Sequence, residues 1–149
     1  MKVVVQRVSE ASVTIDGDVH GKIGRGYLLL VGISDEDDEA VVRKMADKII
    51  HLRIFEDENG KMNLSLGQVE GAVLSISQFT LFADAKKGNR PSFSNAGKPD
   101  HAKPLYLYFN AYMRDQGVQV EEGIFGADMK VRLLNDGPVT ILLDSREMF

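Results

Sequence analysis

The sequence predicts an α/β fold: a strand-rich single domain, residues 1–149, with curled, barrel-like mixed sheets flanked by two amphipathic helices. Short apolar stretches near both ends of the chain alternate with polar residues as strands do, and two longer stretches repeat apolar residues at helical spacing. A length of 149 residues with 44% hydrophobic residues suits one domain with its own core. No internal repeat suggests a different architecture.

The first third of the chain is expected to form strands. Residues 3–5 and 13–15 place valine or isoleucine beside polar neighbours, and Asp16-Gly17-Asp18 is a turn sequence, so a β-hairpin is expected. Residues 27–33 (YLLLVGI) lack alternation, which is typical of a short strand covered on both faces.

A helix should follow, with Ser34 as its N-cap. The acidic residues between 35 and 39 suit the positive end of the helix dipole, which explains them as a helix start rather than a metal site. The apolar residues at helical spacing are Val41, Met45, Ile49 and Leu52.

The middle of the chain predicts a hairpin, a strand and a long loop. Asn59-Gly60 is a strong hairpin signal between short apolar segments, and residues 73–79 read as a strand. Residues 83–100 contain four glycine or proline residues and no apolar period, so they predict a long loop of the kind that is often functional.

A second helix and two strands complete the expected fold. The helix should have Pro104 near its first turn and Gly117 as its stop, with an aromatic stripe that belongs to the core or to an interface. Residues 129–133 and 139–143 alternate cleanly around Asp136-Gly137, which predicts two strands paired with each other.

Composition limits the function. Without cysteine, the chain has neither disulfides nor thiolate chemistry, which suits a reducing cytoplasm, and no apolar run suits a signal peptide or a membrane anchor. The net charge of −4 argues against non-specific coating of nucleic acid. Residues 86–103 nevertheless carry five basic residues and one acid: a local phosphate contact and a solvated loop both fit.

Polar side chains gather where the predicted strand 73–79 ends. Ser77, Gln78 and Thr80 could form a site on a rigid scaffold, although these residue types alone favour an ordinary strand end with satisfied polar groups. No histidine or lysine accompanies Thr80 to activate it as a nucleophile.

Two segments, Ser77-Gln78-Phe79-Thr80-Leu81 and residues 135–140 (NDGPVT), closely resemble the signature motifs of the D-aminoacyl-tRNA deacylase family, also called the D-tyrosyl-tRNA deacylase family. Residues 1–13, residues 87–93 (KGNRPSF) and Leu143-Asp144-Ser145 resemble that family in the same order. The resemblance covers essentially the whole chain.

The resemblance implies a cytoplasmic homodimer that hydrolyses D-aminoacyl-tRNA and mischarged glycyl-tRNA, with each active site completed by Gly137 and Pro138 of the partner. The ligand would be the aminoacylated 3′-terminal adenosine. A cis Gly137-Pro138 bond is expected, with carbonyls that read the chirality of the substrate. Neither a metal nor another cofactor is expected, in agreement with three scattered histidines.

An aminoacyl ester is already activated, so its hydrolysis mainly needs a placed water and a stabilised oxyanion. We therefore expect Thr80, Gln78, Ser77 and Phe79 to form the catalytic site. In this interpretation Thr80 is a positioning residue, the N–H groups around Phe79 and Thr80 hold the oxyanion, and the ribose hydroxyl assists the water. The basic side chains Lys86, Lys87 and Arg90 are expected to contact tRNA phosphates.

Two other classes of function stay open at this point. A non-catalytic RNA-end-binding module could use the basic loop and the aromatic helix, but the aromatic residues recur at core spacing. A serine or threonine esterase for small metabolites would need a nucleophile elbow and a triad histidine, and the sequence offers neither.

Overall fold

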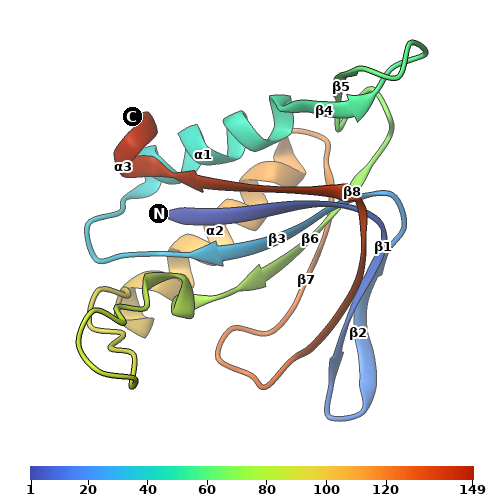
Figure 1. Ribbon diagram of the computed structural model, residues 1–149. Helices are drawn as coiled ribbons and strands as arrows, with labels where there is room; N and C mark the ends of the chain where they lie inside the picture. The colour runs from blue at the N-terminus through green and yellow to red at the C-terminus, as the bar shows by residue number, and fades with distance from the viewer.

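The computed structural model describes residues 1–149, and its centre is a six-stranded mixed sheet that curls into a nearly closed barrel (Figure 1). β1 has β8 along one edge, with β3 and then β2 along the other, and β6 and β7 extend the sheet in parallel to β3. Its strands are β1 (Lys2–Ile15), β2 (Asp18–Ile23), β3 (Gly26–Gly32), β6 (Ala72–Ser77), β7 (Gln119–Glu122) and β8 (Lys130–Asp144).

Two long helices cover one side of this sheet and pack against each other, which confirms the predicted fold class (Figure 1). The main core lies between them and the sheet, where Val5 and Leu29 meet Met45 and Phe109. A second, smaller core fills the curl of the barrel. The remaining elements are α1 (Glu39–His51), β4 (Arg53–Glu56), β5 (Met62–Ser65), the 3₁₀ turn η1 (Phe79–Phe82), α2 (Pro99–Asp115) and α3 (Ser145–Met148).

Both hairpin predictions and the buried strand are confirmed. β1 and β2 pair around Asp16-Gly17, where both residues have positive φ, and β4 and β5 pair around Asn59-Gly60. β3 is buried along almost its whole length.

The two helix starts differ from the prediction. Asp38, not Ser34, caps α1, because its side chain accepts a hydrogen bond from the Val41 N–H at 2.9 Å, while Ser34 hydrogen-bonds to Asp37. α2 begins at Pro99 rather than near Pro104. Pro99 occupies the first helical position, where a missing N–H does no harm, and Pro104 lies within the helix.

The predicted pair of C-terminal strands is wrong. Residues 130–144 form the single strand β8, and both halves of it pair with β1 rather than with each other. The Gly137-Pro138 bond is cis, as predicted. Strand β6 also stops at Ser77, two residues before the predicted end, because the chain turns into η1 at Phe79.

The N-terminus is anchored inside the fold. The Met1 ammonium group donates to Asp37 Oδ1 at 2.7 Å and to Ser145 Oγ at 2.8 Å, and Met1 itself is buried. These contacts join the start of β1 to the segment before α1 and to α3. None of the helices has the length and apolar character that crossing a bilayer requires.

Candidate active site

The polar segment predicted from the sequence lies at the end of β6, where the chain leaves the sheet. The Gln78 N–H donates to the Val31 carbonyl at 2.7 Å, which continues the pairing of β6 with β3 for one residue. Immediately afterwards η1 turns the chain away, so Ser77 and Gln78 belong to the sheet end and Thr80 to the turn. A rigid strand thus positions the segment.

Thr80 is held as a hydrogen-bond donor. Gln78 Nε2 donates to Thr80 Oγ1, so the hydroxyl proton of Thr80 is free to point toward a ligand. The first hydrogen bond of η1 runs from the Leu81 N–H to the Gln78 carbonyl, and the N–H groups of Phe79 and Thr80 precede it. Two backbone donors and one hydroxyl donor are therefore close together, and no histidine or carboxylate hydrogen-bonds to Thr80.

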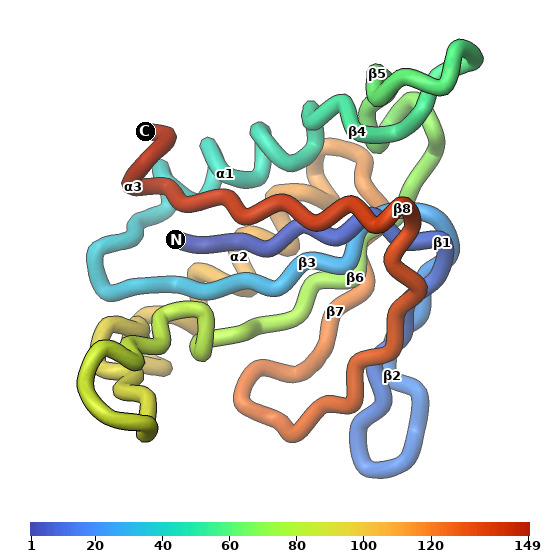
Figure 2. The backbone as a smooth tube through the Cα atoms, in the orientation of Figure 1, coloured from blue at the N-terminus to red at the C-terminus, as the bar shows by residue number.

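A largely apolar cavity of about 710 Å³ opens beside this segment. Ser77, Gln78 and Phe79 form part of its wall. The opposite wall comes from α2 and from the loop between β7 and β8, which Figure 2 shows in orange below the sheet. A cavity of this size, mostly apolar with a few polar side chains in its wall, suits a small-molecule ligand.

Several cavity residues were missed by reasoning from the sequence. Tyr106, Phe125 and Met129 line the cavity, yet only the Gly123 and Gly126 flanking Phe125 hinted at a functional loop. Burial raises the pKa of the Tyr106 hydroxyl, which stays protonated and donates to the Ser75 carbonyl at 2.7 Å. Tyr106 is therefore an uncharged part of the cavity wall, and its hydroxyl is held in place by Ser75.

The three loop cations expected to contact tRNA lie outside the cavity, although other residues of their loop line it. Lys86, Lys87 and Arg90 are exposed and do not line the cavity, whereas Phe93, from the same loop, does. Phe93 packs edge-to-face on Phe79, with ring centroids 5.2 Å apart. The aromatic pair therefore joins the loop to the rim of the cavity.

Both arms of this loop are tied down. The N–H and C=O groups of Asp84 and Ser92 exchange two hydrogen bonds of 2.8 Å. The Gly97 N–H donates to the Ile33 carbonyl at 2.8 Å, and the Lys98 N–H donates to Asp35 Oδ1 at 2.9 Å. A Cβ at Gly97 would lie 2.9 Å from the Ile33 carbonyl oxygen, so the close approach requires glycine.

The second predicted motif forms an exposed excursion of β8. Between the pairs Gln6↔Thr140 and Val8↔Asn135, β1 has one residue and β8 has four, so residues 136–139 project from the sheet. Asn135 spans the base, since its Nδ2 donates to the carbonyls of Arg7 (2.9 Å) and Val139 (3.0 Å).

Arg7 supports this excursion from inside and was missed by the sequence analysis. Its guanidinium is buried and donates to the Ile54 carbonyl at 2.7 Å and to the Asp136 carbonyl at 3.2 Å. A Cβ at Gly137 would lie 3.1 Å from Arg7 Nη2 and 2.8 Å from Val139 Cγ2, so the packing requires glycine here.

One chain does not bring the two motifs together. The excursion lies opposite Arg7, which is in register with Tyr27 and through it with Val73, four residues before Ser77 along β6. At about 3.3 Å per residue and about 4.8 Å per strand, this offset across three strand spacings is on the order of 20 Å. In Figure 2 the bend of β8 indeed lies at the opposite end of the sheet from η1.

Comparison with known proteins identifies close relatives. The family model described as D-Tyr-tRNA(Tyr) deacylase matches residues 4–144. The chain is 58% identical to a D-aminoacyl-tRNA deacylase of Thermus aquaticus (99% of this chain, 97% of the relative). It is 57% identical to one of Bacillus velezensis (99% and 100%).

Two solved structures have the same fold. The first is a c-Myc DNA Unwinding Element Binding Protein, with a TM-score of 0.90 and 43% identity over 97% of this chain and 98% of that one. The second is a probable eukaryotic D-amino acid tRNA deacylase, with a TM-score of 0.83 over 95% of this chain and 97% of that one. At 20% identity, this second likeness concerns the fold alone.

Proposed function

The chain belongs to the D-Tyr-tRNA(Tyr) deacylase family, and on this premise we propose that it hydrolyses the ester between a D-amino acid and the 3′-terminal adenosine of tRNA. The observation that carries the proposal is the end of β6, where Ser77, Gln78 and Phe79 line the cavity. Thr80 follows directly and accepts a hydrogen bond from Gln78, although it is not itself part of the cavity wall. We propose the cytoplasm as its location and mischarged glycyl-tRNA as a further substrate.

Incubation with matched D- and L-tyrosyl-tRNA tests this function. Only the D-ester is expected to be hydrolysed faster than in buffer. A binding module would hydrolyse neither, and an esterase for small metabolites would act without tRNA.

In the mechanism that we propose, the cavity holds the adenosine and the ester carbonyl faces η1. The N–H groups of Phe79 and Thr80 stabilise the oxyanion that forms when water attacks the carbonyl carbon. Thr80 donates a hydrogen bond from its hydroxyl to a substrate oxygen, while the same hydroxyl accepts one from Gln78 Nε2. The ribose hydroxyl next to the ester assists the water, and the tetrahedral intermediate collapses to release the amino acid and tRNA.

Thr80→Ala is expected to slow hydrolysis of D-tyrosyl-tRNA by about 10- to 1,000-fold without abolishing it, because the backbone donors persist. Single-turnover rates measure the loss. Thr80→Ser keeps the hydroxyl and should restore most of the rate. Detection of an acyl-enzyme on Thr80 would instead identify a nucleophile.

We propose further that the protein works as a homodimer in which the excursion at Gly137 and Pro138 reaches the partner's cavity. The separation of about 20 Å within one chain supports this arrangement, as does the exposure of the excursion. An apolar row crosses the face of the sheet that points away from α1 and α2. In it Val4 is in register with Leu30, which packs against the second core, and with Leu142, which is 64% exposed. Such a row suits an isologous contact with a second copy.

Chirality would be read by the backbone of that excursion. A side-chain pocket would select by the size of the amino acid, whereas the carbonyls near Gly137 and Pro138 could accept the ammonium group of any D-residue and exclude every L-substituent. Glycine has no substituent and should pass. The support of the excursion by the buried Arg7 fits this requirement for a fixed backbone.

The exposed cations of the loop, Lys86, Lys87 and Arg90, would contact tRNA phosphates. Replacing all three with glutamine is expected to raise the KM for D-tyrosyl-tRNA and to flatten its log–log dependence on salt by about one unit per lost contact. A kinetic salt series measures the slope. An unchanged slope would show that the loop is merely solvated.

A further inference from the structure

A basic groove lies beside η1, and no step of the proposed hydrolysis uses it. It has a volume of about 430 Å³. Lys2 from the start of β1, Lys86 from the loop and Arg146 from α3 all line it, with Asp84 as the only acidic residue in its wall. Three cations from distant parts of a chain with a net charge of −4 therefore converge on one depression.

Contacts with the protein fix two of these cations. The Lys2 ammonium lies 5.0 Å from the centroid of the Phe82 ring and 3.5 Å from the Leu81 carbonyl oxygen. Arg146 donates through Nε and Nη2 to the Asp144 carboxylate at 3.3 and 3.1 Å, which leaves the Nη1 donors available. The groove thus presents charged donors that the protein itself positions, and charged donors bind phosphate oxygens well.

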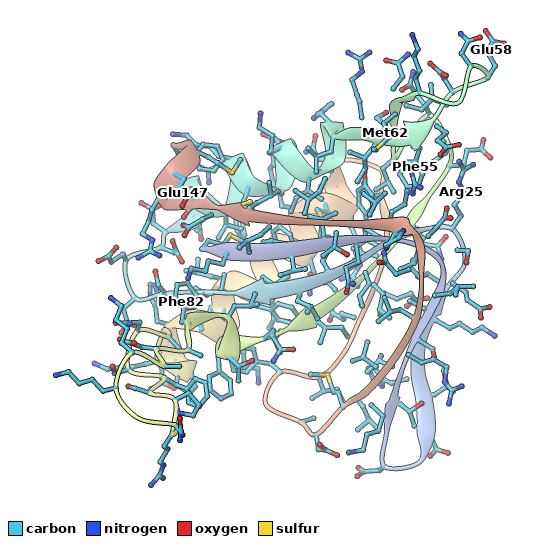
Figure 3. All side chains as sticks on the ribbon, in the orientation of Figure 1. Arg25, Phe55, Glu58, Met62, Phe82 and Glu147 are labelled. Atoms are coloured by element: carbon cyan, nitrogen blue, oxygen red, sulfur yellow. The ribbon has the colours of Figure 1, made fainter.

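The groove and the active-site cavity lie on the two sides of one narrow ridge. Ser94 and Ala96 line the cavity, whereas Asn95 between them lines the groove. In η1, Phe79 likewise faces the cavity and Phe82 the groove. Figure 3 labels Phe82, which lines the groove from η1.

We propose that this groove binds phosphodiester groups of the single-stranded tRNA 3′ end, in the nucleotides immediately before the terminal adenosine. The proposal rests on the proposed function, which places the adenosine in the cavity and its ester at η1. The strand then leaves the cavity across the ridge, and its phosphates meet Lys2, Lys86 and Arg146. Base identity plays no part in these contacts, because phosphate contacts position a strand without reading it.

Binding of uncharged tRNA tests the groove separately from catalysis. With intact tRNA, Lys2→Gln/Arg146→Gln is expected to raise the Kd on the order of tenfold and to flatten the log–log salt slope by about 0.7 per lost contact. With tRNA trimmed of its single-stranded 3′ end, this variant and the unmodified protein should bind alike. Fluorescence anisotropy over a salt series measures both.

Two further variants serve as controls. Lys22→Gln/Arg132→Gln likewise removes one lysine and one arginine, but from a separate pocket at the β1–β2 hairpin. This variant should leave the log–log salt slope of tRNA binding unchanged. Lys2→Arg/Arg146→Lys keeps both charges and should restore binding. Thermal melting checks that each variant is folded.

Catalysis provides an independent measurement. The Lys2→Gln/Arg146→Gln variant should hydrolyse D-tyrosyl-adenosine, which has no phosphodiester, at an unaltered rate, while its KM for D-tyrosyl-tRNA rises. The proposal would be contradicted if the variant kept the log–log salt slope of the unmodified protein for intact tRNA. It would also be contradicted if the variant lost as much affinity for trimmed tRNA as for intact tRNA. If inorganic phosphate binds the unmodified protein more tightly than the variant while both keep the same tRNA salt slope, the groove binds a free anion instead, which also contradicts the proposal. Failure of the unmodified protein to hydrolyse either ester would refute the proposed function and leave the binding test valid.

Discussion

Replacing Leu142 with aspartate should convert the protein to a monomer and reduce hydrolysis of D-tyrosyl-tRNA by at least about 100-fold. The side chain is 64% exposed in one chain and lies in the apolar row with Val4 and Leu30. Burial of a leucine side chain contributes about 1.5–3 kcal/mol, and burial of an unpaired carboxylate costs considerably more. Sedimentation together with single-turnover rates measures both effects.

The matched control is Val19→Asp, since Val19 is 63% exposed but lies on β2, at the distal hairpin. This variant should keep a mass of about twice the 16.5 kDa of one chain and its full activity. An active monomeric Leu142→Asp protein would contradict the shared site, because one chain would then suffice.

Arg7→Leu is expected to have the second large effect, a loss of about 100-fold in the rate on D-tyrosyl-tRNA together with weaker rejection of L-tyrosyl-tRNA. Leucine keeps the apolar stem but leaves the buried Ile54 carbonyl without its donor, which costs roughly 1–3 kcal/mol. The part-buried Asp136 carbonyl also loses its donor, at a smaller cost because water can reach it. The excursion at Gly137 then loses its support, and a displacement of about 1 Å in a positioning group can cost about 100-fold in rate.

Rates with the D- and L-esters, sedimentation and thermal melting separate a positioning role from a structural one. Arg7→Lys should not rescue activity, because an ammonium group cannot reproduce the fork that contacts two carbonyls. The control Arg53→Leu removes an exposed arginine of β4 and should leave both rates unchanged. A folded, dimeric Arg7→Leu protein with unaltered discrimination would exclude Arg7 from chiral selection.

Local signals predicted much of the fold, and long-range pairing decided the rest. The turn at Asp16-Gly17 is correct because a two-residue turn depends on its own dihedral angles. The hairpin at Asn59-Gly60 is also correct, although its loop spans residues 57–61 and only Gly60 has positive φ. Asp136-Gly137 has the same local character, yet β8 continues past it, since β1 is long enough to pair with both halves. Strand β7 was missed because its four residues (QVEE) form a strand only beside β6.

In the candidate site, too, local signals predicted some residues and long-range contacts determined the others. The segment Ser77–Thr80 was predicted, but only the family resemblance distinguished it from an ordinary strand end. Arg7 could not be found from its own surroundings, because its hydrogen-bond partners Ile54 and Asp136 lie 47 and 129 residues away along the chain. A lone arginine in an alternating strand predicts an exposed residue, whereas tertiary contacts bury this one.

The hydrogen bonds that tie down the basic loop have a thermodynamic consequence. Asp84 and Ser92 close one arm, and Gly97 and Lys98 fasten the other to the segment after β3, so most of the ordering entropy is lost during folding rather than on encounter with RNA. The loop is thus preorganised, and tRNA binding should carry only a small conformational penalty on the protein side. Slow amide hydrogen exchange at Gly97 and Lys98 in the free protein is the corresponding signature.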